Sequence, residues 1–219
     1  MPQTSTFDPL AMTANKRFTI AATYRITHDA ARSVKILSRF QDAHGKHFAE
    51  RIMLAVTEVN GCALCAHAHT RFALEAGMEA DEVRDLLGGV TDGAPDEELT
   101  AIAFAQHYAD ADAHPEHSAW EKLVDFYGTQ DALGILSAIR VMMWGNAVGL
   151  PLSSIRARRA GNPQPNTRLL SDLGATVATI LVTPFALLHA LASTIRRKPL
   201  GPETVVTPGG ALGNPVTLL

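Results

Sequence analysis

The chain has 219 residues, 47% of them hydrophobic and 19% charged, which is typical of a protein with one well-filled core. Its formal net charge is -3 and it has no long basic stripe, so we do not expect it to bind nucleic acid. The first 16 residues are polar, are broken by Pro2 and Pro9, and lack the charged and apolar regions of a secretory signal. We therefore expect a cytoplasmic protein.

The spacing of apolar residues and the positions of glycines predict an all-α fold. After a flexible tail over residues 1–18, helices are expected over 22–40, 47–59, 62–76, 81–87, 96–111, 115–127 and 130–148. Gly77 should end the third of these helices, and Gly149 with Pro151 should end the last. No run of alternating apolar and polar residues indicates a strand. We therefore expect one helical domain over residues 19–158.

A change in composition follows this domain. Residues 159–168 form a predicted linker, residues 169–198 an apolar helical extension, and residues 199–219 a flexible tail. Residues 173–192 carry no formal charge and precede three basic residues, so the segment is formally long enough to span a membrane. Its threonines, Pro184 and His189 dilute its hydrophobicity. We favour packing of 169–195 on the core or on a neighbouring subunit over contact with a membrane.

The two cysteines of the chain, Cys62 and Cys65, stand at the start of the predicted helix 62–76. At about 100° per residue, Cys62, Cys65 and His69 share one face of that helix. Three-residue spacing allows a disulfide within one turn, and four-residue spacing brings the His69 imidazole beside the Cys65 sulfur. A helix start also favours a thiolate, which is the nucleophilic form of cysteine. The local geometry therefore predicts a redox-active dithiol, with Cys65 as the attacking sulfur.

Three other interpretations of the cysteine pair remain, and one of them, two buried and inert cysteines, would not explain the position at a helix start or His69. A structural disulfide is disfavoured by the reducing compartment that we expect. A zinc site formed by Cys62, Cys65, His67 and His69 is disfavoured because His67 lies away from the other three on the same helix, and a second Cys-x-x-Cys is missing. We therefore predict neither a metal nor another cofactor, and we interpret His67 as a surface or inter-subunit residue.

The preceding helix supplies a carboxylate. Glu50 falls at the edge of its buried side, where an acid needs a partner, and a hairpin of the two helices could set it against His69. Glu58 falls on the polar side with Arg51 and Ala55, so it is better interpreted as a solvated acid or a member of a salt bridge. We therefore include Glu50 in the predicted site.

The run from Glu58 to Thr70 (EVNGCALCAHAHT), with Glu50 before it, resembles the core motif of the AhpD-like alkylhydroperoxidases of the carboxymuconolactone decarboxylase superfamily. Those proteins have a Glu, then a Cys-x-x-Cys, then a His four residues after the second Cys. The run from Asp96 to His107 resembles the helix that follows in this family, and the likeness covers roughly residues 20 to 150. The resemblance implies an AhpD-like helical domain that assembles into a homo-oligomer.

The resemblance also implies a role for each matching residue. Cys65 matches the peroxidatic cysteine, which a hydroperoxide converts to a sulfenic acid. Cys62 matches the resolving cysteine, which condenses with Cys65 to a disulfide and then meets an external dithiol or protein reductant. His69 matches the histidine beside Cys65, and Glu50 matches the acid that orients it. The implied activity is that of a thiol-dependent peroxidase or disulfide oxidoreductase.

One position departs from the pattern. The residue before the second cysteine is a histidine in the peroxidase proper and Leu64 here, which leaves the substrate and the reductant open. Decarboxylase members generally lack the dithiol, so a lactone decarboxylase is disfavoured. The competing hypotheses are a non-enzymatic redox sensor or oligomeric binding protein that uses the dithiol as a switch and, less favoured, a metal-binding protein.

Overall fold

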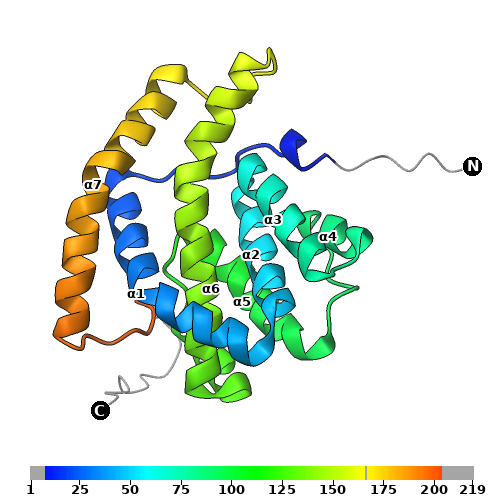
Figure 1. The fold of residues 1–219 in the computed structure, drawn as a ribbon, viewed down its shortest axis with the longest axis vertical. Coiled ribbons are helices and arrows are strands. Elements are labelled where there is room, and N and C mark those ends of the chain that lie inside the picture. Colours follow the sequence, from blue (N-terminus) through cyan, green and yellow to red (C-terminus); the bar gives the residue numbers. More distant parts are fainter. Residues whose placement is uncertain (1–7, 166, 204–219) are drawn as a thin grey trace, which may run out of the picture.

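The computed structural model describes residues 8–165 and 167–203, and the regular structure of these residues is helical (Figure 1). The α-helices are α1 (Ile20–His44), α2 (Lys46–Asn60), α3 (Ala63–Ala76), α4 (Ala80–Leu87), α5 (Leu99–Asp110), α6 (His117–Arg159) and α7 (Leu169–Ile195). Two short 3-10 helices, η1 (Pro9–Ala11) and η2 (Asp96–Glu98), complete the described part. No strand occurs within these residue ranges, and the prediction of an all-α protein is confirmed.

The longest helix, α6, combines two of the predicted helices and extends beyond the predicted end of the second. Gly128 interrupts it with a non-helical backbone (φ 75°, ψ 162°), close to the predicted break between residues 127 and 130. The predicted end at Gly149 and Pro151 is wrong, because α6 continues to Arg159. A proline inside a helix removes one backbone hydrogen bond. Leu150, Pro151 and Ser154 are buried there, and this packing offsets the loss.

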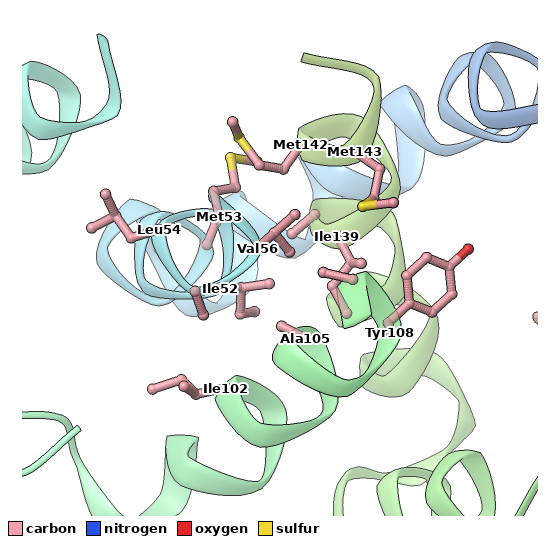
Figure 2. Packing of buried hydrophobic residues seen from close by; sticks show 14 of the residues in the cluster. Ile52, Met53, Leu54, Val56, Ile102, Ala105, Tyr108, Ile139, Met142 and Met143 are labelled. Carbon is pink, nitrogen blue, oxygen red and sulfur yellow. The ribbon is translucent and has the colours of Figure 1, made fainter. Parts of the chain in front are cut away.

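Helix α2 lies at the centre of the fold, with α1, α3, α4, α5 and α6 around it. Its residues Ile52, Leu54 and Val56 are all fully buried although they point in different directions around the helix. Figure 2 shows Ile52 and Val56 between residues of α5 and α6, among them Ala105 and Ile139. The expectation that Ala55 points to solvent is wrong for the same reason: α5 and its neighbours cover the side of α2 that the sequence pattern assigned to water.

The segment before α1 packs on the turn between α2 and α3. The backbone N–H of Asn15 donates to the carbonyl oxygen of Asn60 (3.1 Å), and its side-chain amide donates to Val59 (3.2 Å). Gly61 at this turn has φ 72°, and a Cβ atom there would lie 2.0 Å from the carbonyl oxygen of Thr13. Residues 8–18 thus make specific contacts, which corrects the expectation of a loose tail there. Residues 1–7 lie outside the described residues.

Helix α7 is one continuous helix that lies along α1 and α6 (Figure 1). Near its start the buried Asp172 accepts a hydrogen bond from Ser154 of α6 (2.6 Å), and near its end Ser193 contacts His28 of α1 (3.1 Å). After α7, the guanidinium of Arg140 donates to the carbonyl oxygens of Leu200 and Gly201. The predicted flexible tail is described only as far as residue 203, and residues 204–219 lie outside the described part.

The outward side of α7 is apolar and exposed. We call the following large exposed residues the α7 apolar face: Leu169, Leu170, Leu173, Val177, Ile180, Leu181, Phe185, Leu187, Leu188, Leu191 and Ile195. This helix and α6 are the two described helices that are long and apolar enough to cross a membrane, but α6 is mostly buried whereas α7 is not. The expected packing on the core thus holds for one side of α7 and leaves the other side uncovered.

Candidate redox site

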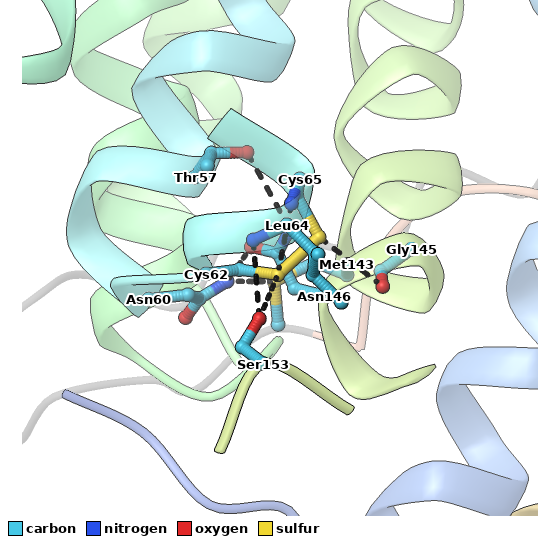
Figure 3. Close-up of a disulfide and its surroundings, with 9 residues drawn as sticks. All are labelled: Thr57, Asn60, Cys62, Leu64, Cys65, Met143, Gly145, Asn146 and Ser153. Carbon is cyan, nitrogen blue, oxygen red and sulfur yellow. Dashed lines mark hydrogen bonds between the residues drawn. A yellow bond between two sulfur atoms is a disulfide. The ribbon is translucent and has the colours of Figure 1, made fainter. Parts of the chain in front are cut away.

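Cys62 and Cys65 are joined by a disulfide at the start of α3 (Figure 3). Their Cα atoms are 5.3 Å apart, a usual separation for such a bond. Cys62 is fully buried, and Cys65 keeps 8% of its surface exposed. Both cysteines are therefore buried, and Cys65 is the less deeply buried of the two.

The local sequence explains why the disulfide stands at a helix start. Gly61 ends α2 in the left-handed conformation, which costs a glycine little. Cys62 follows as the N-cap residue of α3, and its sulfur accepts a hydrogen bond from the backbone N–H of Cys65 (3.4 Å). In this position the sulfurs face the unpaired N–H groups at the positive end of the helix.

Helix α6 forms the wall against which the disulfide packs. A Cβ atom on Gly149 would lie 2.6 Å from both sulfurs, so only glycine allows this approach. The carbonyl oxygen of Gly145 lies 3.4 Å from the Cys65 sulfur. Ser153 accepts a hydrogen bond from the N–H of Leu64 (3.1 Å), and its oxygen lies 4.0 Å from the Cys62 sulfur (Figure 3). The sequence pattern did not indicate these three residues: it placed the helix end at Gly149, before Ser153, and gave no sign that Gly145 and Gly149 face the cysteines.

Glu50 of α2 and His69 of α3 lie in contact with each other. The Nδ1 atom of His69 lies 2.7 Å from a carboxylate oxygen of Glu50, which is 7% exposed. Because a carboxylate only accepts hydrogen bonds, the Nδ1 atom carries the proton and the Nε2 atom of the neutral ring keeps its lone pair. His69 stands one helical turn after Cys65, so its ring is on the same side of α3 as the cysteine. The structure thus pairs Cys62 with Cys65 and Glu50 with His69, and both pairs lie on the α2–α3 hairpin.

A buried polar network fixes this hairpin against α6. The side-chain amide of Asn60 donates to the side-chain oxygen of Asn146 (2.8 Å), and the amide of Asn146 lies 3.4 Å from the Thr57 hydroxyl. All three residues are fully buried. Because a broken buried hydrogen bond leaves an unsatisfied polar group, this network holds the end of α2, and hence Cys62, in one position relative to α6.

His67 and Glu58, which the sequence analysis left out of the predicted site, also lie outside it in the structure. His67 is exposed. Glu58 is half-buried and accepts a hydrogen bond from Gln106 (3.5 Å) rather than from a basic side chain. Burial raises the pKa of the Glu58 carboxyl, and the Gln106 hydrogen bond opposes the rise. Within residues 8–165 and 167–203, no three His, Cys, Asp or Glu side chains are grouped so that they could hold a metal ion.

The fold and the site together define an all-helical protein with a cysteine pair at a helix start and an acid–histidine pair one turn away. Residues 42–108, from the end of α1 into α5, match the model of the carboxymuconolactone decarboxylase family. This segment, which holds all four predicted site residues, is similar to that family. No curated protein and no solved structure shows a significant match to the chain.

Proposed function

We propose that the chain is a thiol-dependent peroxidase or disulfide oxidoreductase that reduces hydroperoxides through Cys62 and Cys65. The observation that carries this proposal is the combination of a Cys62–Cys65 disulfide at the start of α3 with the Glu50–His69 pair one turn further along. A dithiol that closes within one helical turn can be oxidised and reduced without unfolding its surroundings. An acid–histidine pair beside it can supply and remove protons.

In the reduced protein the reaction starts at Cys65. Its thiolate attacks one oxygen of the hydroperoxide, the O–O bond breaks, and an alcohol leaves while Cys65 becomes a sulfenic acid. The Cys62 thiolate then attacks the Cys65 sulfur, releasing water and forming the disulfide. An external dithiol returns the protein to its reduced state and is itself oxidised to a disulfide. Cys65 is assigned to the first step because it is the less deeply buried cysteine and precedes His69 by one helical turn.

His69 and Glu50 are assigned to proton transfer. The Nε2 atom of His69 has the free lone pair that can take the proton from the Cys65 thiol and return it to the leaving alkoxide. Glu50 holds the ring through Nδ1 at 2.7 Å and stabilises the imidazolium that forms between these two steps. Both side chains are largely shielded from water, which strengthens this interaction.

The similarity of residues 42–108 to the family supports a redox function only in part, because the family is named for a decarboxylase. Decarboxylation does not require a pair of cysteines that can form a disulfide. The presence of the Cys62–Cys65 disulfide therefore favours thiol redox chemistry over lactone decarboxylation for this chain.

The test is consumption of cumene hydroperoxide by the full-length protein with dithiothreitol as the dithiol. We expect turnover by the wild-type protein, its loss in Cys65→Ser, and a reduction of at least about tenfold in His69→Ala. The exposed His67→Ala is the matched control and should keep wild-type activity. Unchanged activity in Cys65→Ser would overturn the mechanism. Reversible disulfide formation without peroxide turnover would instead favour the redox-sensing alternative.

A further inference from the structure

The two sulfurs of the disulfide have different surroundings. We infer that Ser153 of α6 is a positioning residue that stabilises the Cys62 thiolate, so that Cys62 is the sulfur that closes the disulfide and leaves when it is reduced. This inference rests on the proposed function and names a residue of α6, outside the matched family segment.

Ser153 is buried, with 3% of its surface exposed, and its hydroxyl oxygen accepts the hydrogen bond of the Leu64 N–H at 3.1 Å. A helical serine commonly donates to the carbonyl four residues earlier, as Ser137 of the same helix does to Leu133 (2.7 Å). Ser153 instead lies with its oxygen 4.0 Å from the Cys62 sulfur. Because the Leu64 N–H occupies an acceptor position of the oxygen, the hydroxyl proton is free to point to the sulfur.

The hydrogen-bond partners of the two sulfurs are opposite in kind. The Cys62 sulfur is within reach of two donors, the Ser153 hydroxyl and the backbone N–H of Cys65 at 3.4 Å. The Cys65 sulfur lies 3.4 Å from the carbonyl oxygen of Gly145, which can only accept. Donors stabilise an anion and a carbonyl oxygen does not. After reduction, negative charge is therefore more stable on Cys62 than on Cys65.

This asymmetry sets the direction of exchange. The thiolate of an external dithiol attacks the sulfur of Cys65, the less deeply buried cysteine, whereas the family resemblance implies that the reductant meets Cys62. The Cys62–Cys65 bond breaks, and its electron pair goes to Cys62, where two donors stabilise the charge. The second thiol of the reductant, once deprotonated, then attacks the mixed disulfide. It releases Cys65, which takes up a proton, and leaves the reductant oxidised. A better-stabilised leaving thiolate leaves faster, so Ser153 accelerates the first step.

The test compares Ser153→Ala with Ser153→Thr, which keeps the hydroxyl, and with Ser137→Ala as the matched control on the same helix. In a Cys65→Ser background, where Cys62 is the remaining thiol, we follow the ultraviolet absorbance of the thiolate against pH. Ser153→Ala should raise the titration midpoint by about one pH unit. In the otherwise wild-type protein, it should slow reduction of the disulfide by dithiothreitol about tenfold. Ser153→Thr and Ser137→Ala should resemble the parent.

Circular dichroism shows whether each variant is folded, and Ser153→Gly provides a second removal of the hydroxyl if the alanine variant is not. An unchanged midpoint and an unchanged reduction rate in a folded variant lacking the hydroxyl would overturn the inference. Neither measurement uses a hydroperoxide. The role of Ser153 can therefore be tested even if the protein has no peroxidase activity, and the peroxidase activity can be tested even if Ser153 has no effect.

A separate observation, the exposed α7 apolar face, carries a second proposal. We propose that this face binds an anionic lipid surface, with α7 lying in the plane of that surface. Leu170, Ile180, Phe185 and Leu188 are each more than 60% exposed. An apolar surface of this extent marks a contact with a partner or a membrane.

The charges around this face favour anionic lipid. Asp172 is the sole acidic residue between Arg168 and Lys198, and it is buried against Ser154. Arg168 at one end and the three basic residues 196–198 at the other are exposed. The hydroxyls of Thr176, Thr179, Thr183 and Thr194 donate to backbone carbonyls of the same helix. The outward side thus combines apolar side chains with positive charge at both ends.

The same charges disfavour a second copy of the chain as the occupant. Antiparallel pairing of two α7 helices would set Arg168 of one against residues 196–198 of the other, and parallel pairing would set the two basic clusters together. Either arrangement places like charges side by side. The inner side of α7 is held to α1, where Tyr24 contacts His189 (3.2 Å) and His28 contacts Ser193 (3.1 Å). Only the outward side can therefore enter the lipid, which means that the helix lies flat.

The test is flotation of the full-length protein with vesicles of phosphatidylglycerol and phosphatidylcholine in equal parts. We expect the protein to bind these vesicles and to bind pure phosphatidylcholine vesicles at least about tenfold more weakly. The double variant Leu181→Glu/Leu188→Glu should not bind. Val90→Glu, at an exposed apolar position outside α7, is the control and should bind normally. Absence of binding would overturn the proposal. So would a vesicle-free dimer that the double variant dissociates, because a second copy would then cover the face.

Discussion

The α2–α3 hairpin and α7 contain similar kinds of apolar residues, but those of α2 are buried in the protein and many of those of α7 are exposed to solvent. Five helices surround α2, and its apolar side chains are buried in every direction, whereas α7 has neighbours on one side and exposes the other. The comparison shows that the number of neighbours decides where an apolar side chain lies, more than the residue itself. In the hairpin, close packing around the sulfurs gives the site its geometry, and the loose environment of α7 leaves a surface for binding.

The sharpest test of this contrast exchanges two glycines for alanine: Gly149 of α6, which packs against the disulfide of the hairpin, and Gly174 of α7. Gly149→Ala places a Cβ atom 2.6 Å from both sulfurs, so it should destabilise the protein by about 3 kcal/mol and slow disulfide formation at least about tenfold. Gly174→Ala on α7 meets no atom within 4 Å and should stabilise the helix by up to about 1 kcal/mol. Urea unfolding and thiol titration measure both effects. Equal outcomes for the two variants would contradict the packing account.

The next comparison removes one leucine side chain from each region. Leu54→Ala in α2 removes a fully buried side chain and should cost about 3 kcal/mol of unfolding free energy. Leu181→Ala in α7, which is 63% exposed, should change the free energy by less than about 0.5 kcal/mol in the absence of lipid. Thermal and urea unfolding provide the values. A large loss in Leu181→Ala would mean that a partner covers α7 in solution.

The third comparison is between a buried and an exposed ion pair. Arg51 of α2 pairs with Glu82 (2.5 Å) and Glu98 (3.1 Å), and all three side chains are largely buried. Burial raises the pKa of the Glu98 carboxyl, and the charge of Arg51 lowers it again. Arg51→Met should therefore cost about 2 kcal/mol, because two shielded carboxylates lose their partner. The exposed Arg71, paired with Glu75, is the control, and Arg71→Met should cost less than about 0.5 kcal/mol.

The smallest expected effect concerns pH. Burial raises the pKa of Glu58 in the folded protein above its ordinary value of 4.5, so the folded state holds the proton more tightly than the unfolded state. The stability linked to this group is complete below the unfolded pKa and is lost as the pH rises through the folded pKa. Glu58→Gln should remove this decline, which is measured as a smaller fall of the urea midpoint between about pH 4 and about pH 7. Glu75→Gln, at an exposed site, should retain the wild-type pH dependence.

The sequence predicted those parts of the site that depend on one helix or on one hairpin. The spacing of Cys62, Cys65 and His69 follows from helical periodicity, and Glu50 was identified because an acid beside a buried face needs a partner. The contribution of α6 was not predicted. Pro151 indicates a helix end by local propensity, and tertiary packing kept the helix intact through Ser153.

The periodicity of the sequence also did not predict that α2 is buried on all sides or that α7 is exposed on one side. The pattern assigned Ala55 to solvent because it takes a helix to have one buried side, and α2 has neighbours on all sides. For α7 the pattern indicated an apolar helix but could not show which side of the helix would pack against α1 and α6. Both results depend on contacts between residues far apart in the chain, which local periodicity does not contain.

The central claim is that Cys62 and Cys65 together reduce a hydroperoxide. A single-turnover experiment tests it most directly: the fully reduced protein is mixed with one equivalent of cumene hydroperoxide, and the cysteines are followed by thiol counting and mass spectrometry. We expect loss of both thiols, formation of the Cys62–Cys65 disulfide and release of one equivalent of alcohol, and we expect a trapped Cys65 sulfenic acid in Cys62→Ser. Intact hydroperoxide beside a dithiol that stays reduced would contradict it.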